Sequence, residues 1–230
     1  MPPSHGAARP SSSASACALE NRSAPKTGSR GTDMGARRLV IGISGASGAA
    51  YGIAALALAR QAGVETHLVV SRSALLTLNQ ELGLRGADLE GRADVIHPVA
   101  DIGASIASGS FRTVGMLVAP CSVRTMSEIA TGVTSTLMSR AADVVLKERR
   151  RLVLMLRETP LHLGHLETMT RLTQMGAIIM PPVPAFYARP RDLDEVVAHS
   201  TARALDLFDI DTGAVRRWSG LKDALAGEMP

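Results

Sequence analysis

Aromatic residues are scarce in this chain of 230 residues, at 3% of the sequence. A hydrophobic core must therefore be built from Ala, Val, Leu, Ile and Met. The two cysteines, Cys17 and Cys121, are too few for a disulfide framework, which favours a reducing compartment. An excess of one charge is also lacking, with 25 basic and 21 acidic residues. This balance predicts no nucleic-acid partner.

Residues 1–33 lack the apolar side chains that a fold needs, since Ala, Ser, Pro and Gly make up 20 of these 33 residues. Such a segment cannot bury enough apolar surface to offset its chain entropy. We predict a disordered extension over 1–36, a folded domain over 37–218 and a tail over 219–230. A transit peptide and a true start at Met34 stay open as alternatives.

Strand-like and helix-like segments alternate along the body, which predicts an α/β fold: a Rossmann- or flavodoxin-like three-layer sandwich around a parallel sheet. The charge-free stretch 39–59 is long enough for a membrane span, but its glycines favour a strand, a turn and a helix, so no membrane association is expected. The predicted strands are 39–43, 66–70, 94–97, 114–119, 152–156 and 177–180. The predicted helices are 49–62, 72–82, 122–131, 135–149, 163–174 and 192–208.

The carboxyl ends of parallel strands are where such folds bind ligands, and the first one is rich in glycine. Gly45, Ala46 and Ser47 follow strand one in a G-x-x-G-x-x-G spacing, which is not the G-x-G-x-x-G of dinucleotide binders. Strand two ends in Ser71, where an NAD-binding protein carries an acidic residue. The pattern favours a flavin mononucleotide (FMN) over NAD. A tight turn and a helix cap are the alternative roles of these residues.

Later strand ends carry further polar residues. Ser122 and Thr125 open a helix and would act either as caps or as ligand contacts. Cys121, next to them, is interpreted as a small buried residue rather than a nucleophile. His162 and His165 have helical spacing, but no further metal ligand is suitably spaced, so we expect no metal site.

Seven segments together resemble the UbiX-type flavin prenyltransferases, in order over about residues 37–218. The most specific are RETPLHLGHL and PPVPAFYARP, with GISGASGAAYG before them. The resemblance implies an enzyme that joins the dimethylallyl group of dimethylallyl monophosphate to N5 and C6 of reduced FMN. It also implies two partner enzymes: a separate flavin reductase, and a UbiD-type decarboxylase that receives the prenylated FMN, often in ubiquinone synthesis. The family is cytosolic and needs no metal. Its members assemble as trimer-based homododecamers with sites between subunits.

The resemblance also assigns roles to individual residues. Ser47 and Glu81 match a pair that moves protons, and Glu158 is the third catalytic candidate. Trp218 matches an aromatic residue near the prenyl tail. The residues that match FMN contacts are Gly45, Ala46, Ser47, Ser71, Ser122, Val123, Arg124, Thr125 and Arg157. Those that match the prenyl-phosphate pocket are Arg140, Lys147, Tyr187 and Arg203. Ser135-Thr136 and Arg151 depart from the family pattern, as does the long N-terminal extension.

Three other functions compete with this one. A flavin-dependent cysteine decarboxylase would carry Pro-Ala-Ser-Ala-Asn-Thr where this chain has PCSVRT. A non-enzymatic FMN carrier would not need Glu81, Glu158 or Lys147, and all three are present. A short-chain NADP oxidoreductase needs Tyr-x-x-x-Lys, but Ala55 and Arg191 stand four residues after the two tyrosines.

Overall fold

The fold is seen in a computed structural model that describes residues 37–215, 217, 218 and 220. The predicted extension over 1–36 lies outside the described residues, as does nearly all of the predicted tail over 219–230. The bounds predicted for these two segments therefore stay predictions.

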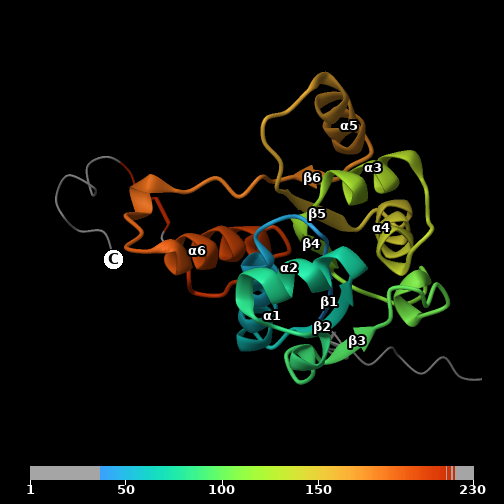
Figure 1. Cartoon of the computed structure of the whole chain (residues 1–230), viewed down its shortest axis with the longest axis horizontal. Helices are drawn as coiled ribbons and strands as arrows, with labels where there is room; N and C mark the ends of the chain where they lie inside the picture. Colours follow the sequence, from blue (N-terminus) through green and yellow to red (C-terminus); the bar gives the residue numbers. More distant parts are fainter. Residues whose placement is uncertain (1–36, 216, 219, 221–230) are drawn as a thin grey trace, which may run out of the picture. The chain divides into compact units, whose positions relative to one another are not determined.

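Six parallel strands form one sheet, which confirms the predicted fold class (Figure 1). The strands are β1 (Arg38–Ile43), β2 (Glu65–Val70), β3 (Val95–His97), β4 (Gly115–Cys121), β5 (Arg151–Leu156) and β6 (Ile178–Ile179). Their order across the sheet is β3-β2-β1-β4-β5-β6, so the direction of winding reverses between β1 and β4. Ligands of such sheets bind where the winding reverses, at the carboxyl ends of the strands.

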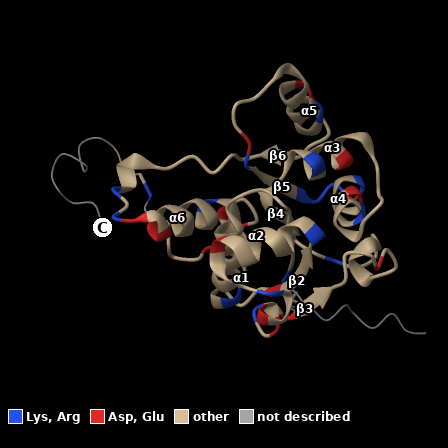
Figure 2. Ribbon diagram, in the orientation of Figure 1, with Lys and Arg blue, Asp and Glu red and all other residues tan. Residues whose placement is uncertain are grey.

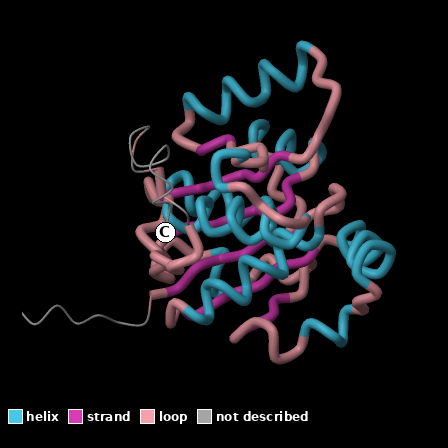
Figure 3. The backbone as a smooth tube through the Cα atoms, turned by 90° about the vertical axis from the view of Figure 1, so that its left-hand side faces the viewer, coloured by secondary structure: helices cyan, strands magenta, loops and turns pink. Residues whose placement is uncertain are grey.

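Helices cover both faces of the sheet (Figure 3). One face packs against α1 (Ala49–Gln61), α2 (Arg72–Leu82) and α6 (Leu193–Asp206). The other packs against α3 (Val123–Thr131), α4 (Leu137–Lys147) and α5 (Leu163–Gln174). The alternation of side chains along a strand separates the two cores: Leu39, Ile41 and Ile43 of β1 face the first, and Val40 faces the second.

All six predicted helices are present, and their ends differ from the prediction by two residues at most. The predicted helix over 135–149 begins at Leu137 because Thr136 caps it. Three short 3₁₀ segments were not predicted: η1 (Gly86–Leu89), η2 (Ser105–Ala107) and η3 (Phe186–Ala188). The edge strand β3 is less buried than an apolar run suggests, since Ile96 keeps 40% of its surface exposed.

The charge-free stretch 39–59 divides into β1, a glycine-rich loop and α1, as predicted. Gly52 lets α1 lie close to the sheet, because a Cβ atom there would meet the carbonyl oxygen of Ala119 at 2.5 Å. Among the described residues, no helix is long and apolar enough to cross a membrane.

Candidate functional site

A cleft of about 480 Å³ opens at the carboxyl ends of β1, β4 and β5. Ser44 ties two of the loops together: its hydroxyl donates to the carbonyl of Pro120 at 2.9 Å and accepts from the backbone N–H of Ser122 at 2.7 Å. Six residues that line the cleft were predicted as site residues: Gly45, Ala46, Ser47, Ser122, Arg157 and Glu158. Residues far apart in sequence therefore share one space.

Arg157 connects β5 to the loop after β1. Its Nε donates to the backbone carbonyl of Ser47 at 3.1 Å. The next residue, Glu158, also lines the cleft, where its carboxylate accepts from the backbone N–H of Thr159 at 3.1 Å. The cleft thus holds a guanidinium and a carboxylate side by side in sequence, which gives it both a cation and a proton acceptor.

Glu81, near the end of α2, reaches the start of α1. Its carboxylate accepts from the backbone N–H of Gly48 at 3.0 Å and from that of Ala49 at 2.9 Å. Burial raises the pKa of Glu81, but hydrogen bonds from Ala49, from the Ser47 side chain and from Gly48, with the charge of Arg157, outweigh it, so the net pKa is lowered. The carboxylate is therefore ionised at neutral pH and is in contact with Ser47.

A second cavity, of about 610 Å³, lies where α2, α3 and α4 begin. Each helix is capped there by the side chain of its N-cap residue. Ser71 accepts from the N–H of Ala74, Ser122 from that of Thr125, and Thr136 from that of Ser139. Six of the lining residues are Ser71, Arg72, Ser122, Arg124, Thr125 and Thr136. Val123, between two of them, is the first residue of α3.

Positive charge predominates around this second cavity, whose charged lining residues are Arg72, Arg124 and Glu128. Helix starts carry partial positive charge, and the first turns of α2, α3 and α4 contain no acidic residue among those described. Arg72 and Arg124 line the cavity and add full charges, although Arg124 also pairs with Glu128 at 2.9 Å. Figure 2 shows how the basic residues, in blue, are distributed over the helices and loops. The cavity is suited to an anion, and it meets the cleft at Ser122, which lines both.

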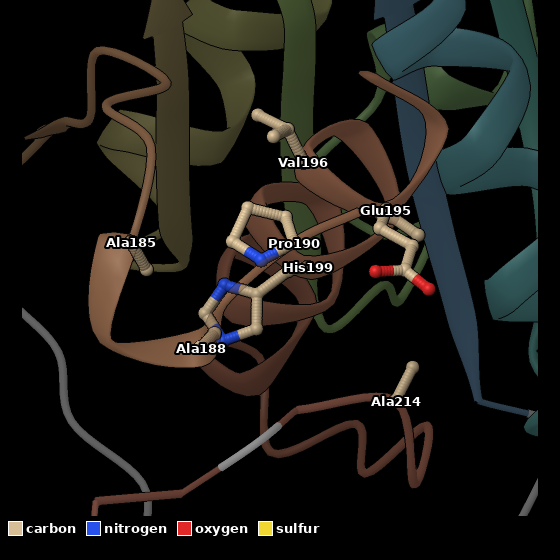
Figure 4. Close-up of a pocket in the computed structure, with 8 residues that line it drawn as sticks. Ala185, Ala188, Pro190, Glu195, Val196, His199 and Ala214 are labelled. Atoms are coloured by element: carbon tan, nitrogen blue, oxygen red, sulfur yellow. The ribbon is translucent and has the colours of Figure 1, made fainter. Parts of the chain in front are cut away.

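A third space, of about 200 Å³, brings Tyr187 of η3 to Arg203 of α6. The ring of Tyr187 makes edge contacts with His199 (6.1 Å between centroids) and with Trp218 (5.9 Å). Arg203 donates to Asp206 at 2.5 Å. Figure 4 shows the neighbouring pocket, in which His199 projects from α6 toward the turn that carries Ala188. His199 lines both pockets.

Two predicted members of the phosphate pocket lie elsewhere in the chain. Arg140 pairs with Asp143 at 2.7 Å, and Lys147, the last residue of α4, pairs with Glu148 at 2.5 Å. Helix α4 begins at the second cavity, so Lys147 lies about 15 Å from it along the helix. Within the described part of the chain, no hydrogen bond or ion pair joins either residue to Tyr187 or Arg203, and their assignment stays a prediction.

Cys121, His162 and His165 were considered as a nucleophile and as metal ligands. Burial raises the pKa of the Cys121 thiol to about 12, which agrees with its interpretation as a small core residue. His162 and His165 stack at 3.6 Å between centroids. Among the described residues, no group of three or more His, Cys, Asp or Glu side chains is placed to hold a metal ion.

Comparison with known proteins assigns the chain to a family. The model of the Flavoprotein family matches residues 27–227. A flavin prenyltransferase UbiX of Neisseria meningitidis serogroup B is 56% identical over 187 residues, which cover 81% of this chain and 99% of that protein. The chain belongs to the UbiX-type flavin prenyltransferases. The predicted resemblance is thereby confirmed, and the family is one of transferases.

Two solved structures of UbiX-type proteins have the same fold. One is AnUbiX in complex with FMN and dimethylallyl pyrophosphate, with a TM-score of 0.79, 47% identity and coverage of 80% of this chain and 98% of that one. The other is a dodecameric FMN-dependent UbiX-like decarboxylase from Escherichia coli O157:H7, with a TM-score of 0.77, 48% identity and coverage of 80% and 100%.

Several residues at this UbiX-type site were not predicted as site residues. Arg72 and Thr136 line the second cavity, and His199 lines the third space. The Thr136-x-x-Ser139 spacing is a cap signal that could have placed the start of α4. Nothing in the sequence marks His199, because its position follows from the fold of residues 185–203.

Proposed function

We propose that this chain joins the dimethylallyl group of dimethylallyl monophosphate to N5 and C6 of reduced FMN, forming prenylated FMN. The observation that carries the proposal is the junction at Ser122 of an open cleft with an anion-binding cavity. A flavin mononucleotide has a flat polar ring system and one phosphate, and it would extend across this junction. The relative crystallised with FMN and dimethylallyl pyrophosphate supports FMN and a phosphate ester of the dimethylallyl group as substrates.

Two sets of residues would hold the two parts of FMN. Gly45, Ala46, Ser47 and Arg157 line the cleft and would hold the ring system. Ser71, Arg124 and Thr125 line the cavity and would hold the phosphate, as would the backbone N–H groups of Val123 and Arg124 at the start of α3. When reduced, the flavin supplies an electron-rich nucleophile. A separate flavin reductase is proposed to supply the electrons.

Ser47, Glu81 and Glu158 are proposed to handle protons. Glu81 is ionised and hydrogen-bonded to the Ser47 side chain, so a proton released at the cleft could pass through the Ser47 hydroxyl to the Glu81 carboxylate. Glu158 lines the cleft on the side of β5. With Glu158 in the cleft and Glu81 in contact with Ser47, a proton could be taken at one place and returned at another.

The prenyl phosphate is proposed to bind Tyr187 and Arg203, with Arg140 and Lys147 added from a neighbouring copy of the chain. Separation of these pairs within one chain supports a site between subunits. Large apolar side chains are exposed on several elements, among them Val183, Phe186 and Leu193 at 72–80%, and such surfaces favour assembly. A trimer-based dodecamer is proposed, in line with the relative described as dodecameric.

Prenylated FMN is proposed to pass to a UbiD-type decarboxylase in the cytoplasm. The test of the function is anaerobic incubation of the chain with reduced FMN and dimethylallyl monophosphate, followed by mass analysis of the flavin. We expect the flavin to gain one dimethylallyl group, and oxidised FMN to stay unchanged as the control. Unmodified reduced FMN, together with carbon dioxide release from a peptide ending in cysteine, would favour the cysteine decarboxylase instead.

A further inference from the structure

The start of α1 is the place where a dinucleotide would bind in a sheet of this order. In folds with the order β3-β2-β1-β4-β5-β6, the glycine-rich turn after β1 leads into a helix whose start holds the pyrophosphate of NAD or NADP. This chain has the sheet order and a glycine-rich turn, and Gly48, the N-cap residue of α1, has no side chain to cap the helix. The backbone N–H groups at the start of α1 therefore need another acceptor.

Glu81 supplies that acceptor from 33 positions away in the sequence. Its Oε2 accepts from Gly48 at 3.0 Å and from Ala49 at 2.9 Å, and its Oε1 accepts from Gly48 at 3.2 Å. A carboxylate thus occupies the backbone donors that a phosphate would use, and it places a negative charge there. A phosphate brought to the start of α1 would lose these hydrogen bonds and meet a like charge.

The end of β2 would not by itself exclude NADP. An arginine near this point accommodates the 2′-phosphate of NADP in related folds, and Arg72 follows Ser71 here. Arg72 lines the second cavity, where α2, α3 and α4 begin and where phosphate binding is proposed. The two candidate phosphate sites therefore differ. The Glu81 carboxylate accepts from the backbone donors of the first. Hydroxyls and two arginines line the second, where the acidic lining residue Glu128 is paired with Arg124 at 2.9 Å.

We propose that the Glu81 carboxylate is an internal anion that prevents a nucleotide pyrophosphate from binding at the start of α1. Phosphate binding is thereby confined to the cavity at α2, α3 and α4. Glu81 then determines specificity in addition to its proposed part in proton transfer. The inference goes beyond the proposed function because it concerns the ligands that the chain rejects.

Inorganic pyrophosphate is the probe, because it is the group that NAD and NADP place at this helix. Equilibrium dialysis measures its binding to the full chain with saturating oxidised FMN and dimethylallyl monophosphate, which fill the other two anion sites. The variants are Glu81→Ala, which removes charge and bulk, and Glu81→Gln, which keeps the shape if the alanine variant does not fold. Glu90→Gln is the matched control, since it removes one exposed carboxylate elsewhere.

We expect Glu81→Ala to bind pyrophosphate at least about tenfold more tightly than the wild type, Glu81→Gln to show a smaller gain, and Glu90→Gln to show none. Equal pyrophosphate affinity of the wild type and both Glu81 variants would overturn the inference, as would an equal gain in Glu90→Gln. Binding of FMN and of dimethylallyl monophosphate to the wild type is measured separately. Its absence would count against the proposed function, while the pyrophosphate comparison would still decide the role of Glu81.

Discussion

Arg157 Nε and the carbonyl oxygen of Ser47 lie 3.1 Å apart, although 110 positions separate the two residues in the sequence. This hydrogen bond fixes the loop after β1 to the residue that follows β5, and both residues line the cleft. It also brings the positive charge of Arg157 close enough to help lower the pKa of Glu81. One guanidinium thus acts on both the shape and the charge of the proposed flavin site.

Replacement of Arg157 by methionine should weaken FMN binding by about tenfold or more, because one hydrogen bond and one charge are lost at the cleft. Titration of flavin fluorescence measures the affinity. Arg171→Met on α5 is the control, since it removes the same charge from an exposed helix. An unchanged FMN affinity in Arg157→Met would show that the loop keeps its shape without the arginine.

Replacement of Gly52 by alanine should destabilise the fold by about 1–3 kcal/mol, because the new Cβ would overlap the Ala119 carbonyl and the Ile43 side chain. Denaturant unfolding measures the loss. Gly86→Ala is the matched control, because its Cβ would make only an ordinary contact with Leu75 at 3.6 Å. Equal stability of the two variants would contradict the close packing of α1 on the sheet.

Replacement of Arg203 by alanine should weaken binding of dimethylallyl monophosphate by roughly 10–150-fold and leave FMN bound, since charge-assisted hydrogen bonds contribute about 1.5–3 kcal/mol. Calorimetry measures this affinity. Wild-type affinity in Arg203→Ala would return Arg203 to a structural role with Asp206.

Glu158→Gln keeps the shape of its side chain and removes the charge, so it should slow single turnover more than it weakens binding of dimethylallyl monophosphate. Calorimetry measures the binding, and rapid-mixing flavin absorbance measures the turnover.

The stability that Asp94 contributes should depend on pH. The backbone N–H of Thr66 is the main cause that lowers the pKa of Asp94; burial opposes it, and the Thr66 hydroxyl and Arg60 add to it. A carboxyl with a lowered folded-state pKa stabilises the fold above its unfolded value, about 3.9, and loses this contribution as the pH falls through the folded value. Wild type and Asp94→Asn should therefore differ most at neutral pH and converge in acid. Unfolding curves at several pH values test this, and a constant difference would refute it.

Cys121 should resist alkylation in the folded protein, because its thiol is buried and its pKa is raised to about 12. Treatment with iodoacetamide before and after unfolding, followed by peptide mass analysis, measures the modification of this cysteine. We expect modification only after unfolding. Rapid labelling of Cys121 in the native protein would mean that β4 opens to solvent.

The fold could be predicted from the sequence because each central strand is a short apolar run that ends at a polar or glycine-rich turn. The predicted strand over 39–43, for example, ends at Ile43, which is also the last residue of β1. The edge strands were harder to bound. β6 comprises only Ile178 and Ile179, since it has a partner on one side only, and the sequence pattern alone extended it.

A site residue could be placed from the sequence where it directly follows a strand. It could not be placed where its position depends on contact with a segment far away in the sequence. Ser71 and Ser122 directly follow strands, so their place at the cavity could be expected. The contact of Glu81 with the start of α1 could not, because no spacing relates the two segments. Only the resemblance to a family pointed to Glu81, and it gave no indication of the hydrogen bonds to Gly48 and Ala49.

The shared beginning of α2, α3 and α4 around one cavity has a consequence for the lifetime of the protein in a cell. An anionic ligand in that cavity would contact three separate segments, so each of them would unfold less often while the ligand is bound. A ligand at 100 times its dissociation constant adds about 2.7 kcal/mol to the stability of the folded state. Proteases cleave mainly the opened form. We therefore expect the abundance of this protein to follow the flavin supply of the cell, with the ligand-free chain degraded first.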